Sequence, residues 1–316
     1  MRLFLLSFML LVSANSFAAK VEQGDYKNRK DVEAFIDRMV TKSDYSEQEL
    51  VSLFSTVKKQ AHLFERLNRP AEKALEWYQY RRIFIKDSRI NKGIEFWQEN
   101  RQLLTEVSRK TGVPPEIIIA IIGVETFYGT YRGKDPVFDS LVTLAFDYPK
   151  RAKFFTRELE QYLLLTKEQN LDTKGLMGSY AGAMGMPQFI SSSYRHYAVD
   201  FDNDGQVNLF DSKPDIFASV ANYFVKHGWR PKEAIAGPLK LSKTNSIDQL
   251  TPGVKTNYTW ADFSKNGLVS NTKLDAATPV ALVQLEQSDH SEYWAGFQNF
   301  YVITRYNHSE LYAMAV

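Results

Sequence analysis

The sequence predicts an α+β protein that is mostly helical and carries a small β-containing subdomain near its C-terminal end. Amphipathic spacing with a helical period runs through much of residues 30–236. From about residue 237, turn residues multiply and short runs of β-branched residues appear. The composition, 44% hydrophobic and 24% charged residues in a chain of 316, is that of a globular protein with room for more than one lobe.

Residues typical of helix ends predict where several helices begin and end. Ser46 and Glu49 form a capping-box pattern, which predicts that a helix begins there. Gly112 is expected to end one helix, and Pro114 and Pro115 to open the next. The other predicted helices cover residues 30–41, 71–85, 93–111, 149–169, 187–198 and 214–227. Strands are predicted at residues 279–285 and 300–304, followed by a short C-terminal helix.

The first residues have the pattern of a secretory signal peptide. Arg2 precedes an apolar run at residues 3–12, and a small-x-small cleavage signal ends at Ala18. We expect residues 1–19 to be a signal peptide, cleaved after Ala18 or Ala19, because the run is too short to remain as a transmembrane anchor. The sequence has no cysteine, so it forms no disulfide and offers no site for an N-terminal lipid. These features predict a soluble periplasmic protein.

Charge and aromatic content limit the kinds of partner. A net charge of +2 is too small to predict binding to nucleic acid. The chain contains 17 Tyr and 21 Phe, and aromatic faces suit sugar rings, although most of these residues are expected in the core. We expect no nucleic-acid partner and no organic cofactor.

Glu125 carries the clearest chemical signal. It follows a nearly continuous apolar run, residues 117–124, and precedes the aromatic and glycine residues 127–129. A carboxyl group in such surroundings is costly to ionise, so its pKa is expected to rise and it can donate a proton near neutral pH. That chemistry suits the acid of a glycoside-cleaving enzyme. The alternative is a helix-end carboxylate that pairs with a neighbouring cation such as Arg132.

Residues 178–189 form a second segment with the composition of a binding site. Its glycines and alanines allow a backbone or a ligand to approach closely. Ser179 and Gln188 add uncharged hydrogen-bonding groups, and Pro187 is expected to open a helix with Gln188 in its first turn. The alternative is tight helix packing through a glycine-rich linker.

Residues 200–211 fit the twelve-residue calcium loop. Gly205 stands at the sixth position, where the loop turns sharply. The last position is Asp211 instead of the usual Glu, and this shorter side chain leaves the preference for Ca²⁺ over Mg²⁺ open. A single loop suggests a structural ion, and the alternative is an acidic surface turn. The expected ligands are the side chains of Asp200, Asp202, Asp204, Asn208 and Asp211 and the carbonyl of Gln206.

With these motifs in order, the chain resembles the lytic murein transglycosylase B family, glycoside hydrolase family 103. The resemblance extends from about residue 28 to the end. It rests on residues 123–129 (Gly-Val-Glu-Thr-Phe-Tyr-Gly), 178–188, 220–224 (Val-Ala-Asn-Tyr-Phe) and 299–307 (Asn-Phe-Tyr-Val-Ile-Thr-Arg-Tyr-Asn). Some members are lipoproteins, whereas this chain has no cysteine to carry a lipid.

The resemblance implies a lysozyme-like helical catalytic lobe with an additional α-domain and the small β-containing subdomain. On this view residues 20–112 belong to the α-domain and residues 113–236 form the catalytic core. Residues 237–298 form the β-containing subdomain, and residues 299–316 return to the α-domain and the cleft. The implied activity is that of a peptidoglycan lytic transglycosylase, which cleaves the β-1,4 bond between N-acetylmuramic acid and N-acetylglucosamine without water.

The resemblance also assigns roles to residues. Glu125 would protonate the bridging oxygen, and its carboxylate would then deprotonate the muramoyl C6 hydroxyl, which attacks C1 and leaves a 1,6-anhydromuramoyl end. Ordinary glycosidases need two carboxylates, but an internal nucleophile makes one sufficient. The residues implied to bind substrate are Ser179, Tyr180, Met184, Gln188, Tyr223, Tyr301, Tyr306 and Asn307, although core positions suit Tyr223 and Tyr301 equally well.

Two other functions remain open from the sequence. A hydrolytic muramidase would need a second carboxylate, which Asp135, Asp139 or Asp147 could supply. A non-catalytic peptidoglycan-binding protein would have no need of Glu125. In every case the expected partner is the glycan strand of peptidoglycan, and the protein is expected to be a monomer with a structural Ca²⁺.

Overall fold

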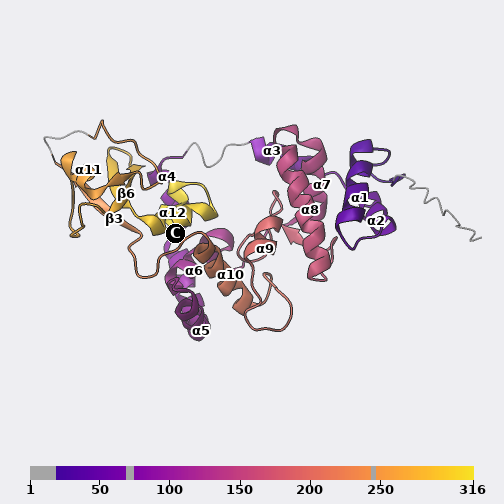
Figure 1. Cartoon of the computed structure of the whole chain (residues 1–316), viewed down its shortest axis with the longest axis horizontal. Coiled ribbons are helices and arrows are strands. Elements are labelled where there is room, and N and C mark those ends of the chain that lie inside the picture. The colour runs from indigo at the N-terminus through magenta and orange to yellow at the C-terminus, as the bar shows by residue number, and fades with distance from the viewer. Residues whose placement is uncertain (1–18, 69–74, 243–246) are drawn as a thin grey trace, which may run out of the picture. The chain divides into compact units, whose positions relative to one another are not determined.

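The computed structural model describes residues 19–68, 75–242 and 247–316 (Figure 1). The signal-peptide prediction, apart from Ala19, and the start of the predicted helix 71–85 lie outside these ranges. The chain divides into two compact units, one ending at Lys59 and the other beginning at Gln60. The domain boundaries predicted near residues 112, 236 and 298 all fall within the second unit and stay predictions.

The first unit is built on two helices, α1 (Lys30–Lys42) and α2 (Glu47–Ser55). The capping box is confirmed, because the Glu49 N–H donates to Ser46 Oγ at 3.2 Å and the Ser46 N–H donates to Glu49 Oε2 at 2.7 Å. The rings of Phe35 and Phe54 meet in its core, with centroids 5.9 Å apart. Each helix therefore buries one apolar stripe against the other.

The second unit begins with helices that alternate with short loops. Helix α5 starts six residues earlier than predicted, and the predicted stretch 149–169 is divided into a 3₁₀ turn and α8. The elements are α3 (His62–Asn68), α4 (Trp77–Phe84), α5 (Asp87–Thr111), α6 (Pro115–Thr126), β1 (Asp135–Pro136), α7 (Val137–Asp147), η1 (Pro149–Arg151), α8 (Ala152–Glu168), β2 (Met177–Gly178), α9 (Ser191–Tyr197) and α10 (Lys213–Lys226).

The junction between α5 and α6 follows the predicted signals. Gly112 adopts a left-handed conformation with φ of 73°, and Pro115 stands at the first position of α6. The side chain of Trp229 donates to the Gly112 carbonyl at 3.1 Å and so satisfies one terminal acceptor. Helix α6 is apolar on most of its surface and packs against α5 and α10 (Figure 1). A helix that is buried on most sides fixes the position of the residues at its end.

Two further helices, α7 and α9, differ from the prediction. Helix α7 was not predicted; nine of its eleven residues are buried, so it has almost no exposed polar face to mark it as a helix. The predicted helix 187–198 is shortened to α9. Gln188 has a left-handed φ of 53° and lies in the loop before α9, so its predicted place in a first helical turn is wrong.

The C-terminal part forms the predicted β-containing subdomain. Its antiparallel sheet has the strand order β4-β6-β7-β3-β5 and includes the predicted strand at residues 279–285. One face packs on a core of its own that contains Phe263, Leu268 and Leu282. The elements are β3 (Ala236–Leu241), β4 (Tyr258–Thr259), α11 (Trp260–Lys265), β5 (Leu268–Ser270), β6 (Pro279–Glu286) and β7 (Ser291–Gly296).

The predicted strand at residues 300–304 is wrong, because these residues lie in helix α12 (Gln298–Tyr306). A short apolar run does not distinguish a strand from a buried helix by its period. Asn299 anchors the start of the helix, since its buried amide donates to the carbonyls of Arg230 and Glu233 at 2.8 and 3.0 Å. The expected C-terminal helix is α13 (Glu310–Ala315). Among the described residues, no helix is long and apolar enough to cross a membrane.

Candidate active site

Glu125 lies in the last turn of α6, directly before a reversal of the chain. Phe127 and Tyr128 both adopt left-handed conformations, with φ of 50° and 57°, and the Tyr128 N–H donates to the Ile122 carbonyl at 3.3 Å. Two consecutive non-glycine residues in this region cost about 1–2 kcal/mol each. The turn therefore requires compensating contacts elsewhere.

Glycines in two helices supply those contacts. The Tyr128 hydroxyl fits between α5 and α6, where a Cβ atom on Gly93 or Gly123 would lie only 2.4 or 2.6 Å from it. The Tyr128 ring also packs on Phe96, with centroids 5.4 Å apart. The fit of this ring fixes the turn and, with it, the end of α6 that carries Glu125.

Tyr312 contacts Glu125 from the C-terminal helix α13. Its hydroxyl donates to Glu125 Oε1 at 2.6 Å, and its side chain is only 2% exposed. Burial, together with the negative charge of Glu125, raises the pKa of Tyr312 well above its ordinary value. The phenol therefore keeps its proton and stays a hydrogen-bond donor. Tyr312 was not predicted as a site residue, because its local pattern is that of a core residue in a short helix.

Further tyrosines continue from Tyr312. The rings of Tyr312 and Tyr306 are stacked with centroids 6.5 Å apart, and Tyr306 and Tyr223 follow at 4.9 Å. The Tyr306 hydroxyl donates to the Pro187 carbonyl at 2.6 Å, and the Tyr223 hydroxyl donates to the Arg305 carbonyl at 2.5 Å. Burial raises the pKa of Tyr306 well above its ordinary value and that of Tyr223 to about 12. Two residues predicted to bind substrate, Tyr306 and Tyr223, thus lie in a row of aromatic rings that reaches Glu125 through Tyr312.

The glycine-rich segment lies beside this row, but its glycines contact protein atoms. A Cβ on Gly178 would lie 2.3 Å from the Ala183 carbonyl oxygen, and one on Gly185 would lie 2.4 Å from the Leu209 carbonyl oxygen. Met184 is fully buried, so its predicted contact with substrate is wrong in this structure because its side chain fills the core of the segment. Gly178 and Gly185 therefore allow close packing of the protein backbone, which was the alternative to a binding role.

The other predicted cleft residues differ in their surroundings. Ser179 Oγ accepts from the Ala183 N–H at 3.0 Å, and Tyr180 is exposed. Tyr301 lies under the Arg305 guanidinium, 5.9 Å from its ring centroid. Tyr301 faces away from the Tyr306 side of α12, because five helical positions separate the two residues by about 140°. Asn307 follows α12 directly, where the helix ends.

The acidic loop brings together three of its predicted ligands. Oxygen atoms of Asp200, Asp202 and Asp204 lie within 4.8 Å of one another. Gly205 turns the loop with φ of 90°, and its N–H donates to Asp200 Oδ2 at 2.9 Å. Clustered carboxylates on a tight turn are the donor set that a hard divalent cation requires, so these three residues fit such an ion.

The remaining predicted ligands are engaged elsewhere. Asn208 Oδ1 accepts from the Phe210 and Asp211 N–H groups at 2.9 and 3.0 Å, and Asp211 Oδ1 accepts from Arg132 at 3.0 Å. Asp215 was not predicted as a site residue. It is 1% exposed and accepts from the backbone N–H groups of Phe201 and Asn208, on the two sides of the loop. Burial raises the pKa of Asp215, while these N–H groups oppose the shift. Gln206 is predicted to contribute only its carbonyl.

Comparison with known proteins decides the family. Residues 27–316 match the family described as the transglycosylase SLT domain. This chain belongs to the transglycosylase SLT family. One relative is the membrane-bound lytic murein transglycosylase B of Escherichia coli (strain K12), which is 39% identical over 93% of this chain and 82% of its own length.

Solved structures of this family share the fold. The catenated lytic transglycosylase SltB1 from Pseudomonas aeruginosa has a TM-score of 0.87 and 41% identity, over 92% of this chain and 96% of that one. The Escherichia coli lytic transglycosylase Slt35 in complex with calcium has a TM-score of 0.86 and 39% identity, over 93% and 92%. The predicted fold class, family and lytic transglycosylase enzyme class are therefore confirmed.

Two of the carboxylates considered for a hydrolytic enzyme already have cationic partners. Asp135 is buried, and its oxygens lie 2.8 Å from His62 Nε2 and 3.0 Å from Arg66 Nη1. Asp139 is also buried and accepts from Lys174. A base that activates water needs a free lone pair near the substrate. These contacts favour structural roles for both residues in this transglycosylase.

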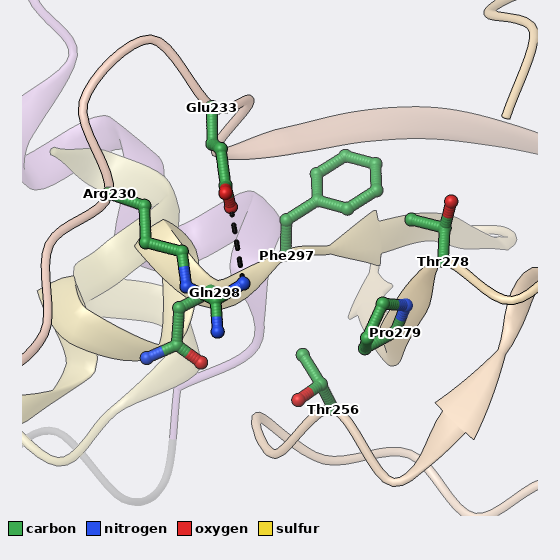
Figure 2. A pocket seen from close by; sticks show the side chains of 7 residues that line it. All are labelled: Arg230, Glu233, Thr256, Thr278, Pro279, Phe297 and Gln298. Carbon is green, nitrogen blue, oxygen red and sulfur yellow. Dashed lines mark hydrogen bonds and ion pairs between the residues drawn. The ribbon is translucent and has the colours of Figure 1, made fainter. Parts of the chain in front are cut away.

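A separate small pocket adjoins the β-containing subdomain (Figure 2). Arg230 and Glu233 lie together on one side of it and form an ion pair, with Nη1 and Oε2 3.5 Å apart. Its cavity of about 120 Å³ is well below the roughly 300–1,000 Å³ of a typical ligand site. None of the predicted site residues lines it.

His227 supports the tyrosine row and predicts a pH effect on stability. Its ring stacks on Tyr223 with centroids 4.1 Å apart, and its Nδ1 lies 2.7 Å from the Tyr223 carbonyl oxygen. Burial lowers the pKa of His227, and the nearby charges of Arg305 and His308 lower it further. The hydrogen bond to the Tyr223 carbonyl opposes this shift. The unfolded chain, with the ordinary pKa of 6.5, therefore binds more protons than the folded one as the pH falls.

Stability is thus expected to decrease as the pH falls through about 6.5 toward the lower pKa of the folded state. The measurement is the Tm of the wild type and of His227→Gln at about pH 7.5 and about pH 5.5. The wild type should lose more Tm on acidification than the variant. An equal loss in both proteins would remove His227 as a source of the pH dependence.

Proposed function

We propose that this transglycosylase cleaves the β-1,4 bond between N-acetylmuramic acid and N-acetylglucosamine, with Glu125 as both acid and base. The observation that carries this assignment is the 2.6 Å hydrogen bond from the buried Tyr312 hydroxyl to Glu125 Oε1. It holds one carboxyl oxygen by a donor that keeps its own proton. The hydrogen bond thereby fixes the orientation of the carboxyl group that acts on the substrate.

The proposed reaction has two proton transfers. In the first, the Glu125 carboxyl group gives its proton to the bridging oxygen as the bond from that oxygen to the muramoyl C1 breaks. The resulting carboxylate is stabilised by the Tyr312 hydroxyl. In the second, it takes the proton of the C6 hydroxyl as that oxygen bonds to C1. The product ends in 1,6-anhydromuramic acid, Glu125 regains its proton, and no water is consumed.

The neighbouring predicted residues are proposed to bind the glycan. Tyr306 and Tyr223 extend the aromatic row from Tyr312, and aromatic faces with polar edges suit sugar rings. Gln188 and Ser179 supply hydrogen-bonding groups from the neighbouring segment. We also propose that the glycan chain contacts Tyr180, Tyr301 and Asn307 farther along its length.

A structural Ca²⁺ in the acidic loop belongs to this proposal. The relative Slt35 was solved in complex with calcium. Here Asp200, Asp202 and Asp204 would hold the ion, which would offset the repulsion among the three carboxylates. The ion would stabilise the loop and would take no part in either proton transfer.

Removal of calcium is therefore expected to lower the Tm more than the activity. An ion present at about 100 times its Kd stabilises a protein by about 2.7 kcal/mol. In a chain of this size such a loss lowers the Tm by roughly 4 °C. Calorimetry with calcium and with chelator, beside turnover at low temperature, measures both effects. An unchanged Tm in chelator would contradict a bound structural ion.

The proposed location is the periplasm, where peptidoglycan lies. It rests on the signal-peptide pattern of residues 1–19. The glycan strand is the proposed partner. The protein is proposed to act as a monomer.

Product analysis tests the proposed reaction. Purified sacculi are digested with the protein, and the released muropeptides are identified by mass spectrometry. Anhydro ends, lighter by one water than reducing ends, are the expected products. Reducing muramic acid ends would show hydrolysis and so favour the muramidase alternative.

A further inference from the structure

Arg132 connects the turn after Glu125 with the acidic loop. Its Nε donates to the Gly129 carbonyl at 3.1 Å, three residues back along that turn. Its Nη1 donates to the Phe210 carbonyl and, at 3.0 Å, to Asp211 Oδ1. One guanidinium therefore binds both the segment that follows the catalytic helix and the last residues of the loop.

The backbone of Arg132 contacts a third segment. Its carbonyl accepts from Gln188 Nε2 at 3.1 Å, and the same amide donates to the Gly185 carbonyl at 2.8 Å. The Gln188 side chain is therefore directed by the position of Arg132. Nearby, the Met186 N–H donates to the Leu209 carbonyl at 2.9 Å and joins the glycine-rich segment to the loop.

Arg132 and Asn208 hold the end of the acidic loop. The side chain of Asp211, at the last loop position, is 78% exposed and turns to Arg132 instead of toward Asp200, Asp202 and Asp204. Asn208 fixes the backbone there by accepting from the Phe210 and Asp211 N–H groups. An Asp at this position is too short to offer both oxygens to an ion as a Glu does. Arg132 thus supplies the positive charge at the end of the loop.

We propose that Arg132 is a positioning residue that holds the acidic loop and Gln188 to the catalytic turn, independently of the metal ion. This rests on the proposed function of Glu125, since the turn matters only if Glu125 acts on the substrate. An exposed ion pair by itself stabilises little, so the pair with Asp211 is the smaller part of the effect. The larger part is the donation to the Gly129 and Phe210 carbonyls, which only the forked guanidinium makes together.

The test compares Arg132→Gln with Arg132→Lys, Asp211→Asn and the control Lys134→Gln, each in the full chain. Lys134 is the exposed cation two residues away, so its replacement matches the change in charge. Initial rates on a soluble glycan give KM and kcat, and isothermal titration with calcium chloride gives the Kd of the loop.

Arg132→Gln is expected to raise KM about 10-fold, since misplaced binding groups cost at least this much. Excess calcium should not restore KM, and the calcium Kd should stay the same or fall, because a competing cation has been removed. Arg132→Lys should recover part of KM, and Asp211→Asn should raise KM less than Arg132→Gln. Lys134→Gln should resemble the wild type.

Two results would overturn the proposal. The first is a wild-type KM in an Arg132→Gln variant whose circular dichroism spectrum shows that it is folded. The second is a weaker calcium Kd in Arg132→Gln together with recovery of KM in excess calcium, which would mean that Arg132 acts through the ion. If Arg132→Gln does not fold, the Arg132→Lys variant is used instead, and a wild-type KM in that variant overturns the proposal. Full activity in Glu125→Gln is a separate result, because it contradicts the proposed function and leaves KM effects of Arg132 measurable.

Discussion

The Glu125→Gln variant is expected to lose about 10³-fold in kcat on peptidoglycan, because one group supplies both proton transfers. Gln keeps the shape of the side chain and can still accept from the Tyr312 hydroxyl, but it neither donates an acidic proton nor acts as a base. KM and Tm should change little, since the fold around the end of α6 is retained. Turbidity loss of sacculi and the rate of muropeptide release measure kcat.

Glu116→Gln is the matched control for this experiment. Glu116 is exposed in the first turn of the same helix, α6, so the substitution removes a carboxylate without touching the site. This variant should clear sacculi at the wild-type rate. Equal clearing by wild type and Glu125→Gln would remove Glu125 from catalysis.

Replacement of Tyr312 by Phe is expected to give the second largest loss. The variant keeps the ring and its packing on Tyr306 but deletes the hydroxyl that donates to Glu125 Oε1. A hydrogen bond to a charged group contributes about 1.5–3 kcal/mol, so kcat should fall by roughly 10- to 100-fold. The same assays apply, with Tm as the measure of folding.

Tyr131→Phe serves as the control for the loss of a hydroxyl. Tyr131 is 70% exposed on the turn that follows Glu125. Its replacement should leave kcat unchanged. A wild-type kcat in Tyr312→Phe would show that the carboxylate needs no donor from α13, and would leave the 2.6 Å contact with a structural role only.

Much of the fold could be predicted because its signals are local. The capping box at Ser46, the left-handed Gly112 and Pro115 at the start of α6 are all confirmed. Helix α7 and the helical state of residues 300–304 could not be predicted from the period. In both, buried residues occupy most faces, so the choice depends on contacts distant in sequence.

The site was predictable where its residues lie in one segment. Glu125 is distinguished by the apolar run before it, and Asp200, Asp202 and Asp204 by their spacing. Tyr312 was missed because its role depends on a contact across 187 positions of the chain.

The pairing of Asp211 with Arg132 was missed for a similar reason. The loop pattern gives the ligand order, but it does not show which outside cation competes for the last carboxylate. Met184 shows the opposite limit. The family resemblance implied a contact with substrate, whereas its side chain is fully buried.

The most direct measurement of the central claim is digestion of sacculi in water labelled with heavy oxygen. If Glu125 directs the muramoyl C6 hydroxyl to C1, the products carry anhydro ends, contain no label, and depend on Glu125 for their formation. Labelled reducing ends that depend on Glu125 would show that water attacks C1, and would contradict the single-carboxylate mechanism.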